Sequence, residues 1–160
     1  MSSRPPATLL DIGCGLAKES ELIQKKYGTD LYLIDGDFKD NGSSRNRDIA
    51  FGDVDSFSFY SSLTDLRNSF NSRKLRYQLF DANDLNLPPV KFDLIMSLLS
   101  CGFHYPVSAY KDLILAHSHP DSIIIVDLRK DFIDQQSEYI GIDHILHDYG
   151  KHIKASITFK

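Results

Sequence analysis

The sequence predicts an α/β fold, a doubly wound and mostly parallel sheet with helices on both faces. The apolar run Thr8 to Ile12 ends in Gly13-Cys14-Gly15, and a helical pattern follows from Lys18 to Tyr27. This order of strand, glycine turn and helix opens a nucleotide-binding βαβ unit. A second apolar run, 31–34, follows the helix, and apolar runs then alternate with helical patterns. The length of 160 residues fits one domain, residues 1–160.

The later elements follow from periodicity and punctuation. Residues 38–58 are polar and lack a period, which predicts a long loop whose role stays open. Between 131 and 149 the helical spacing is weak and breaks near Gly141, so we expect one strand after the fifth and a shortened C-terminal end. The remaining predictions are helices over 60–70 and 107–118, and strands over 76–80, 94–99, 122–128 and 153–159.

Composition argues against several kinds of protein. The net charge of −4 and the pI near 5.8 do not favour a nucleic-acid-binding surface. The longest apolar runs are too short to span a bilayer, and the two cysteines lack metal-site or redox-motif spacing. His144-x-x-His147 is interpreted as the polar face of a helix, not as a metal site. We therefore expect a cytoplasmic protein with no metal, nucleic-acid or membrane partner.

The glycine turn carries the first functional signal. Its two glycines permit a tight turn and a close ligand approach. A dinucleotide fingerprint would place a third glycine at Lys18, and this chain has an acid on the strand instead, Asp11. Asp11-x-Gly13-x-Gly15 resembles motif I of class I S-adenosylmethionine (SAM) dependent methyltransferases, in which the turn wraps the methionine and ribose part of SAM. The resemblance departs at Ala17, where that family often has a third glycine.

The second strand ends in Asp35-Gly36-Asp37. Asp35 lies 22 positions after Gly13, close to the offset of about 20 at which a nucleotide-binding sheet places its ribose-binding acid. A carboxylate there can accept hydrogen bonds from both ribose hydroxyls. Asp37 is the competing candidate for this role.

An ordered set of motifs extends the resemblance over residues 7–130. The glycine turn, Asp35, Asp81-Ala82 after the third strand and Asp93 opening the fourth occur in the order found in class I SAM-dependent methyltransferases. That family has a Rossmann-like sheet, and its acid after the third strand approaches the adenine; Asp84 is the alternative to Asp81. The cofactor is then SAM, and the resemblance implies these binding residues: Asp11, Gly13, Cys14, Gly15, Asp35, Gly36, Asp81, Ala82 and Ser97.

The segment Ser97 to Pro106 leaves the fourth strand and carries the candidate chemistry. It looks like the corresponding segment of small bacterial sugar O-methyltransferases. His104 is the candidate base because imidazole titrates near neutrality, and Tyr105 is the candidate for orienting the acceptor. The position lacks the Asn/Asp-Pro-Pro-aromatic loop of amino-methyltransferases, and it lacks the carboxylates of metal-assisted enzymes.

The predicted function is therefore SAM-dependent O-methylation of a small hydroxylated acceptor such as a sugar. One alternative is a catalytically silent SAM-binding subunit that supports a partner, which the shortened end would favour. Another is a nicotinamide-dependent oxidoreductase. The sequence leaves homo-oligomer formation open.

Overall fold

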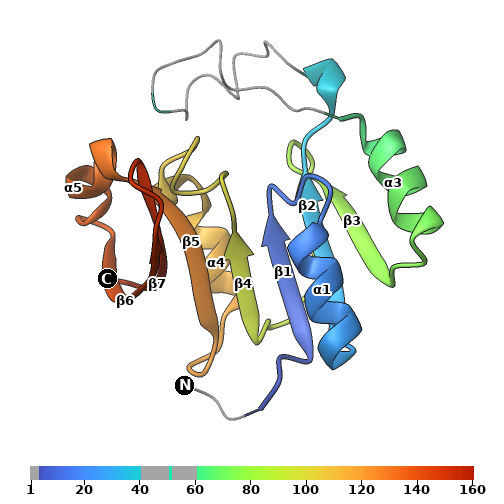
Figure 1. The fold of residues 1–160 in the computed structure, drawn as a ribbon, viewed down its shortest axis with the longest axis horizontal. Coiled ribbons are helices and arrows are strands. Elements are labelled where there is room, and N and C mark those ends of the chain that lie inside the picture. The colour runs from blue at the N-terminus through green and yellow to red at the C-terminus, as the bar shows by residue number, and fades with distance from the viewer. Residues whose placement is uncertain (1–3, 41–50, 52–60) are drawn as a thin grey trace.

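A computed structural model describes residues 4–40, 51 and 61–160. Its centre is a seven-stranded sheet in the order β3-β2-β1-β4-β5-β7-β6 (Figure 1). The five strands from β3 to β5 pair in parallel, and β7 runs antiparallel to both β5 and β6. This confirms the doubly wound, mostly parallel sheet. The strands are β1 (Thr8–Ile12), β2 (Asp30–Asp35), β3 (Tyr77–Asp81), β4 (Leu94–Ser97), β5 (Ile123–Arg129), β6 (Ile140–Asp148) and β7 (His152–Phe159).

Helices cover both faces of the sheet. α1 (Lys18–Tyr27) and α3 (Leu63–Ser72) lie on one face, and α4 (Lys111–His117) lies on the other (Figure 1). The alternation of strand side chains feeds two cores. Leu9 belongs to the same buried core as Leu66 of α3, whereas its neighbour Leu10 belongs to the core that contains Ile114 of α4. The shorter helical segments are the 3₁₀ turns Phe38–Asp40, Val107–Tyr110 and Lys130–Phe132, and α5 (Ile133–Gln136).

Local sequence explains where these helices begin and end. α1 stops at Gly28, which adopts φ +75° and donates its N–H to Gln24 O at 2.7 Å. α3 starts after Ser62, whose Oγ accepts the N–H of Asp65 at 3.0 Å. The helix expected over 60–70 is therefore confirmed in its described part, while residue 60 and most of the 38–58 segment lie outside the described residues.

The C-terminal end is not shortened, and this prediction was wrong. Residues 140–148 form a strand, β6, which pairs with β7 along most of its length and completes the sheet. The register shifts between Ile142 and His144 and again between Ile145 and His147. Each irregularity displaces the two-residue alternation of side chains, and the edge strand is mostly exposed. The period that would have identified a strand is therefore missing from the sequence.

Two further boundaries differ from the prediction. β4 ends at Ser97 and not at Leu99, because Leu99 adopts φ +58° and leaves the sheet. The segment 107–118 begins as a 3₁₀ turn, and only Lys111–His117 is α-helical. Neither α4 nor any other helix in the described part of the chain has the length and apolarity needed to cross a bilayer.

Candidate functional site

The candidate site lies at the carboxyl ends of the parallel strands. β1 has β2 on one side and β4 on the other, so the order of the sheet reverses here. Open α/β sheets bind ligands at such a switch point. The glycine turn after β1, the acid at the end of β2 and the segment after β4 therefore share one edge of the sheet.

The glycine turn is tied to the end of β2. The N–H groups of Gly13 and Cys14 both donate to Ile34 O, at 2.8 and 2.9 Å. Gly15 has φ +48° and open space where a Cβ would stand. Ala17 occupies the left-handed region with φ +49° and precedes α1, a conformation that costs a non-glycine residue about 1–2 kcal/mol. The position at which that family often has glycine is therefore left-handed in this chain, although alanine occupies it.

Gly13 lies close to another part of the chain, Ser100. A Cβ added to Gly13 would lie 2.3 Å from Cβ of Ser100, in the segment after β4. Gly13 also has φ +71°, which disfavours any side chain. The absence of a side chain at Gly13 thus lets the segment after β4 rest on the turn.

Asp35 lies at the tip of β2 and faces the turn. Its Oδ2 accepts the N–H of Gly15 at 2.5 Å, and its Oδ1 accepts the N–H of Gly36 at 2.8 Å. Burial raises the pKa of Asp35, although the N–H groups of Gly15 and Gly36 and the Cys14 thiol oppose this. The Cys14 Sγ lies 3.8 Å from Asp35 Oδ2, and burial raises the pKa of this thiol.

The competing acid, Asp37, is engaged elsewhere. It is buried, and its two oxygens accept the N–H groups of Lys39 at 3.1 Å and Leu63 at 3.4 Å. Asp37 therefore holds the start of α3. Asp81, next to Asp35 in the sheet register, accepts the N–H of Asn83 at 2.9 Å.

Ala82 joins the same edge through its backbone, because its N–H donates to Asp35 O at 2.8 Å. Asp84 is exposed, and its N–H donates to Asp81 O at 3.1 Å. The alternative acids Asp81 and Asp84 thus occupy one turn after β3.

Asp11 lies beneath α1, where the Ser20 hydroxyl donates to its Oδ2 at 2.5 Å. Asp11 is 4 % exposed. Burial raises its pKa to about 7; the Ser20 bond opposes this, and the charges of Asp35 and Glu19 add to it. The structure therefore places Asp11 behind the turn, on its helix side.

The segment after β4 is a compact turn. Ser97 is buried, donates to Ile12 O at 2.7 Å and accepts the N–H of Cys101 at 2.8 Å, so it ties β4 to β1. The carbonyl of Ser100 accepts the N–H groups of the three residues 103–105, at 2.8–3.1 Å. These bonds fix the backbone that carries the candidate catalytic residues.

His104 and Tyr105 have different surroundings. His104 is half-buried, and its ring contacts Phe103 edge-to-face at 4.9 Å. Burial and the nearby positive charge of Arg129 lower the pKa of His104, which favours the neutral imidazole. Tyr105 is 9 % exposed. Burial and the charge of Asp35 raise its pKa, which places its phenol within electrostatic range of that acid.

The end of β5 adds residues that sequence reasoning did not assign to the site. Asp127 is 2 % exposed, and its Oδ2 accepts the N–H of Leu99 at 3.2 Å. Its Oδ1 and the Oγ of the buried Ser156 have no hydrogen-bond partner within the described part of the chain. Arg129 follows two positions later, among aromatic rings. Their position at the carboxyl end of a parallel strand was the available signal.

No cluster of metal ligands occurs among the described residues. His144 and His147 lie on β6, not on the helix expected there.

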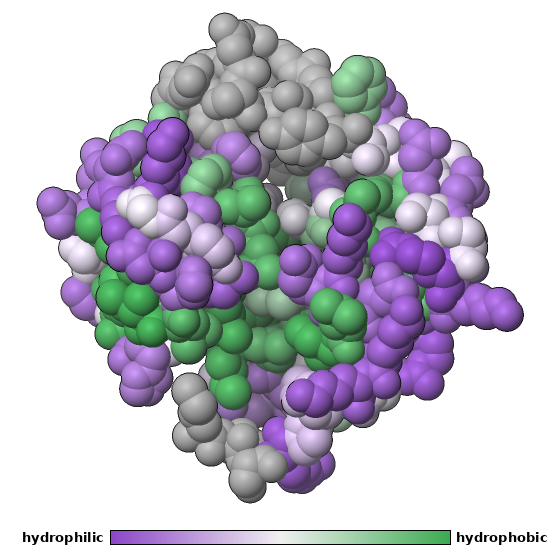
Figure 2. Space-filling model, viewed as in Figure 1, coloured by the Kyte–Doolittle hydropathy of each residue, from purple (hydrophilic) through white to green (hydrophobic). Residues whose placement is uncertain are grey.

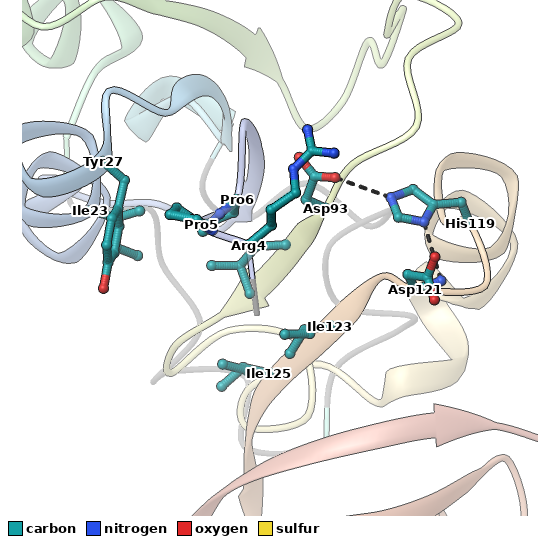
Figure 3. Close-up of a pocket in the computed structure, with 11 residues that line it drawn as sticks. Arg4, Pro5, Pro6, Ile23, Tyr27, Asp93, His119, Asp121, Ile123 and Ile125 are labelled. Carbon is teal, nitrogen blue, oxygen red and sulfur yellow. Dashed lines mark hydrogen bonds and ion pairs between the residues drawn. The ribbon is translucent and has the colours of Figure 1, made fainter. Parts of the chain in front are cut away.

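An apolar cavity of about 470 Å³ lies away from the glycine turn, at the amino ends of β4 and β5. Hydrophobic residues gather over these strands on the face that α1 covers only in part (Figure 2). Asp93 at the cavity wall accepts the N–H groups of Ala7 at 2.7 Å and Thr8 at 3.0 Å, and lies 3.3 Å from His119 Nε2 (Figure 3). Asp93 therefore holds the entry to β1 and lies outside the candidate site.

No protein-family model matches the sequence, and no curated protein matches it. Solved structures do match. A ribosomal protein L11 methylase from Lactobacillus delbrueckii subsp. bulgaricus superposes with a TM-score of 0.68 at 15 % identity, covering 99 % of this chain and 72 % of that one. A precorrin-6y C5,15-methyltransferase from Geobacter metallireducens gives 0.60 at 12 % identity, covering 98 % and 81 %.

The plantazolicin methyltransferase BpumL, solved with S-adenosylhomocysteine (SAH), gives a TM-score of 0.52 at 21 % identity. It covers 81 % of this chain and 42 % of its own. These similarities extend over most of the chain and show its fold. The chain has the Rossmann-like fold of class I SAM-dependent methyltransferases.

Proposed function

We propose that this protein is a SAM-dependent methyltransferase that forms an O-methyl group on a small hydroxylated acceptor such as a sugar. The observation that carries the proposal is Asp35, a carboxylate held by the N–H groups of Gly15 and Gly36 at the switch point of a methyltransferase fold. The structural neighbour that was solved with SAH supports the choice of cofactor.

The residues at this edge fit such a cofactor. Asp35 is only partly buried, and the space beside Gly15 is open, so a ribose could reach the carboxylate. Asp81 and Ala82 lie on the neighbouring strand end, where the adenine is expected. The remaining residues, Asp11, Gly13, Cys14 and Ser97, shape and support the turn. SAM supplies a methyl group on a positively charged sulfur, and the chain supplies alignment and a base.

His104 is the proposed base. It lies on the segment that rests on the glycine turn, and its lowered pKa keeps the imidazole able to accept a proton at neutral pH. Tyr105 would act through its phenol, which is within range of the charge on Asp35.

The shortened end no longer supports the silent-subunit alternative, because the sheet continues through β6 and β7. The nicotinamide alternative still lacks the third glycine of its fingerprint.

Calorimetry with SAH tests the cofactor part. Asp35→Ala should weaken binding by about 1.5–3 kcal/mol, as expected for hydrogen bonds to a charged group. Asp37→Asn is the matched control, since Asp37 is engaged at the start of α3, and it should change SAH affinity little. Equal affinity of the Asp35→Ala variant and the parent would contradict the ribose role.

A further inference from the structure

Aromatic rings from separate parts of the chain meet beside the candidate base. Phe103 follows β4, Phe132 follows β5, and His152 and Tyr149 belong to the β6–β7 hairpin; Phe51 completes the set, and we call these five residues the ring wall. Tyr149 stacks on His152 at 4.6 Å, and His152 contacts Phe103 edge-to-face at 5.2 Å. Phe51 stacks on Phe132 at 4.4 Å.

Arg129 joins the two halves of the ring wall. Its guanidinium carbon lies 4.8 Å from the centre of the Phe132 ring and 5.9 Å from that of Phe103. The rings restrict the side chain, which nevertheless keeps 27 % of its surface exposed. Its ion pair with Asp131 is long, at 3.4 Å, and Asp131 is 74 % exposed, so this pair contributes little. A restrained and accessible guanidinium of this kind suits a carboxylate ligand.

The ring wall and the base belong to one place. Phe103 precedes His104 in the chain, and the two rings are in contact. The charge of Arg129 acts on the His104 imidazole, which places the guanidinium within electrostatic range of the base. Phe51 also donates its N–H to His104 O at 3.2 Å. A molecule seated on the rings would therefore present its hydroxyl near His104.

We propose that the ring wall binds the methyl acceptor, and that this acceptor is a planar aromatic ring carrying a hydroxyl and a carboxylate. The inference rests on the proposed function and narrows its acceptor. Flat rings stack well on aromatic side chains, and Arg129 gives the carboxylate a partner, whereas a neutral sugar would leave that charge unused.

The transfer balances with the groups present. The phenolic oxygen forms a bond to the methyl carbon as the S–CH₃ bond of SAM breaks, and the electron pair of that bond stays on sulfur, giving SAH. The phenolic proton passes to the neutral imidazole of His104.

Direct binding to the SAH-loaded chain tests this without relying on turnover. The probes are the three hydroxybenzoate isomers, 4-hydroxybenzyl alcohol, gluconate and glucose, titrated by calorimetry. At least one hydroxybenzoate should bind more tightly than the alcohol, gluconate and glucose, by about tenfold, the size expected for a hydrogen bond to a charged group.

Variants assign that preference to residues. Arg129→Gln should abolish the preference for the acid over the alcohol, and Arg129→Lys should keep part of it. Phe103→Leu should weaken both aromatic probes. Lys130→Gln is the matched control, because Lys130 is an adjacent cation that pairs with Asp148 at 2.8 Å. This variant should bind every probe with the affinity of the parent. Unchanged melting temperatures show that each variant is folded.

The outcomes separate the two proposals. Failure to bind SAH defeats the proposed function. Three results, each with intact SAH binding, would overturn the aromatic-acid acceptor and leave the cofactor assignment standing. They are no affinity for any hydroxybenzoate, glucose or gluconate bound as well as the hydroxybenzoates or better, and an unchanged preference for the acid in the Arg129→Gln variant.

Discussion

Replacing Asp11 by Asn should remove a large part of the pH dependence of stability between about pH 4 and 7. Burial raises the pKa of Asp11 from an ordinary 3.8 to about 7. The folded state therefore holds this proton more tightly than the unfolded state does. The stability that this proton contributes to the folded state is fully present below the unfolded pKa of Asp11 and is lost as pH rises through about 7. A difference of about three pH units corresponds to about 4 kcal/mol, a large share of the 5–15 kcal/mol typical of domains.

Urea unfolding followed by circular dichroism at several pH values measures this effect. Asn is neutral throughout and keeps an acceptor for the Ser20 hydroxyl, so the variant should gain stability relative to the parent as pH rises from 4.5 to 7.5. Asp93→Asn is the control of opposite sign. Burial would raise the pKa of Asp93, but bonds from Thr8, Ala7 and His119 outweigh it and hold the pKa below its ordinary value. Parallel pH profiles for the Asp11→Asn variant and the parent would refute the reasoning.

Three further changes test other parts of the site. Gly13→Ala should destabilise the fold by about 2–4 kcal/mol, from left-handed strain and from the clash with Ser100. Adding Ser100→Gly should recover the part of the unfolding free energy that the clash removes, as measured by urea unfolding, and a double variant no more stable than Gly13→Ala would contradict the contact. Leu99→Gly should raise stability by up to about 1 kcal/mol, because φ is +58° and the side chain is half-exposed; a lower melting temperature would count against this strain. His104→Ala should cut turnover by roughly 10²–10⁴ while SAH affinity holds, and the parent's rate should rise with pH through a pKa below the usual 6.5; full activity in the variant would end the role of His104 as base.

The opening of the fold was predictable because its signals are local. The apolar run of β1, the glycines and the helix stop at Gly28 each act within a few residues, and the predicted bounds of β1 and α1 match the structure. The order of the strands in the sheet was not predicted and comes from the structure.

The missed features depend on distant or irregular contacts. β6 was missed because its bulges and exposure erase the alternation that marks a strand. β4 ends early because Leu99 adopts a left-handed conformation, which a leucine in the sequence does not predict. The N–H of Leu99 donates to Asp127 of β5, a contact between residues far apart in the chain.

The candidate site divides in the same way. Asp35 could be placed at the turn by its offset from Gly13, and the structure brings the two together. The surroundings of Arg129 could not be predicted, since its two ring partners follow β4 and β5. One of them, Phe103, is in turn contacted by His152 of the β6–β7 hairpin. Asp11 could be recognised as part of the Asp11-x-Gly13-x-Gly15 motif. Its burial under α1 could not be predicted, because it depends on how the helix packs.

The most direct test of the central claim is calorimetric titration of the protein with SAM, SAH and NAD under one set of conditions. The site at the glycine turn and Asp35 predicts that SAM and SAH each bind once per chain and that NAD does not. Absence of SAM and SAH binding by the folded protein, or tighter binding of NAD than of either, would contradict the assignment of this site to a methyltransferase.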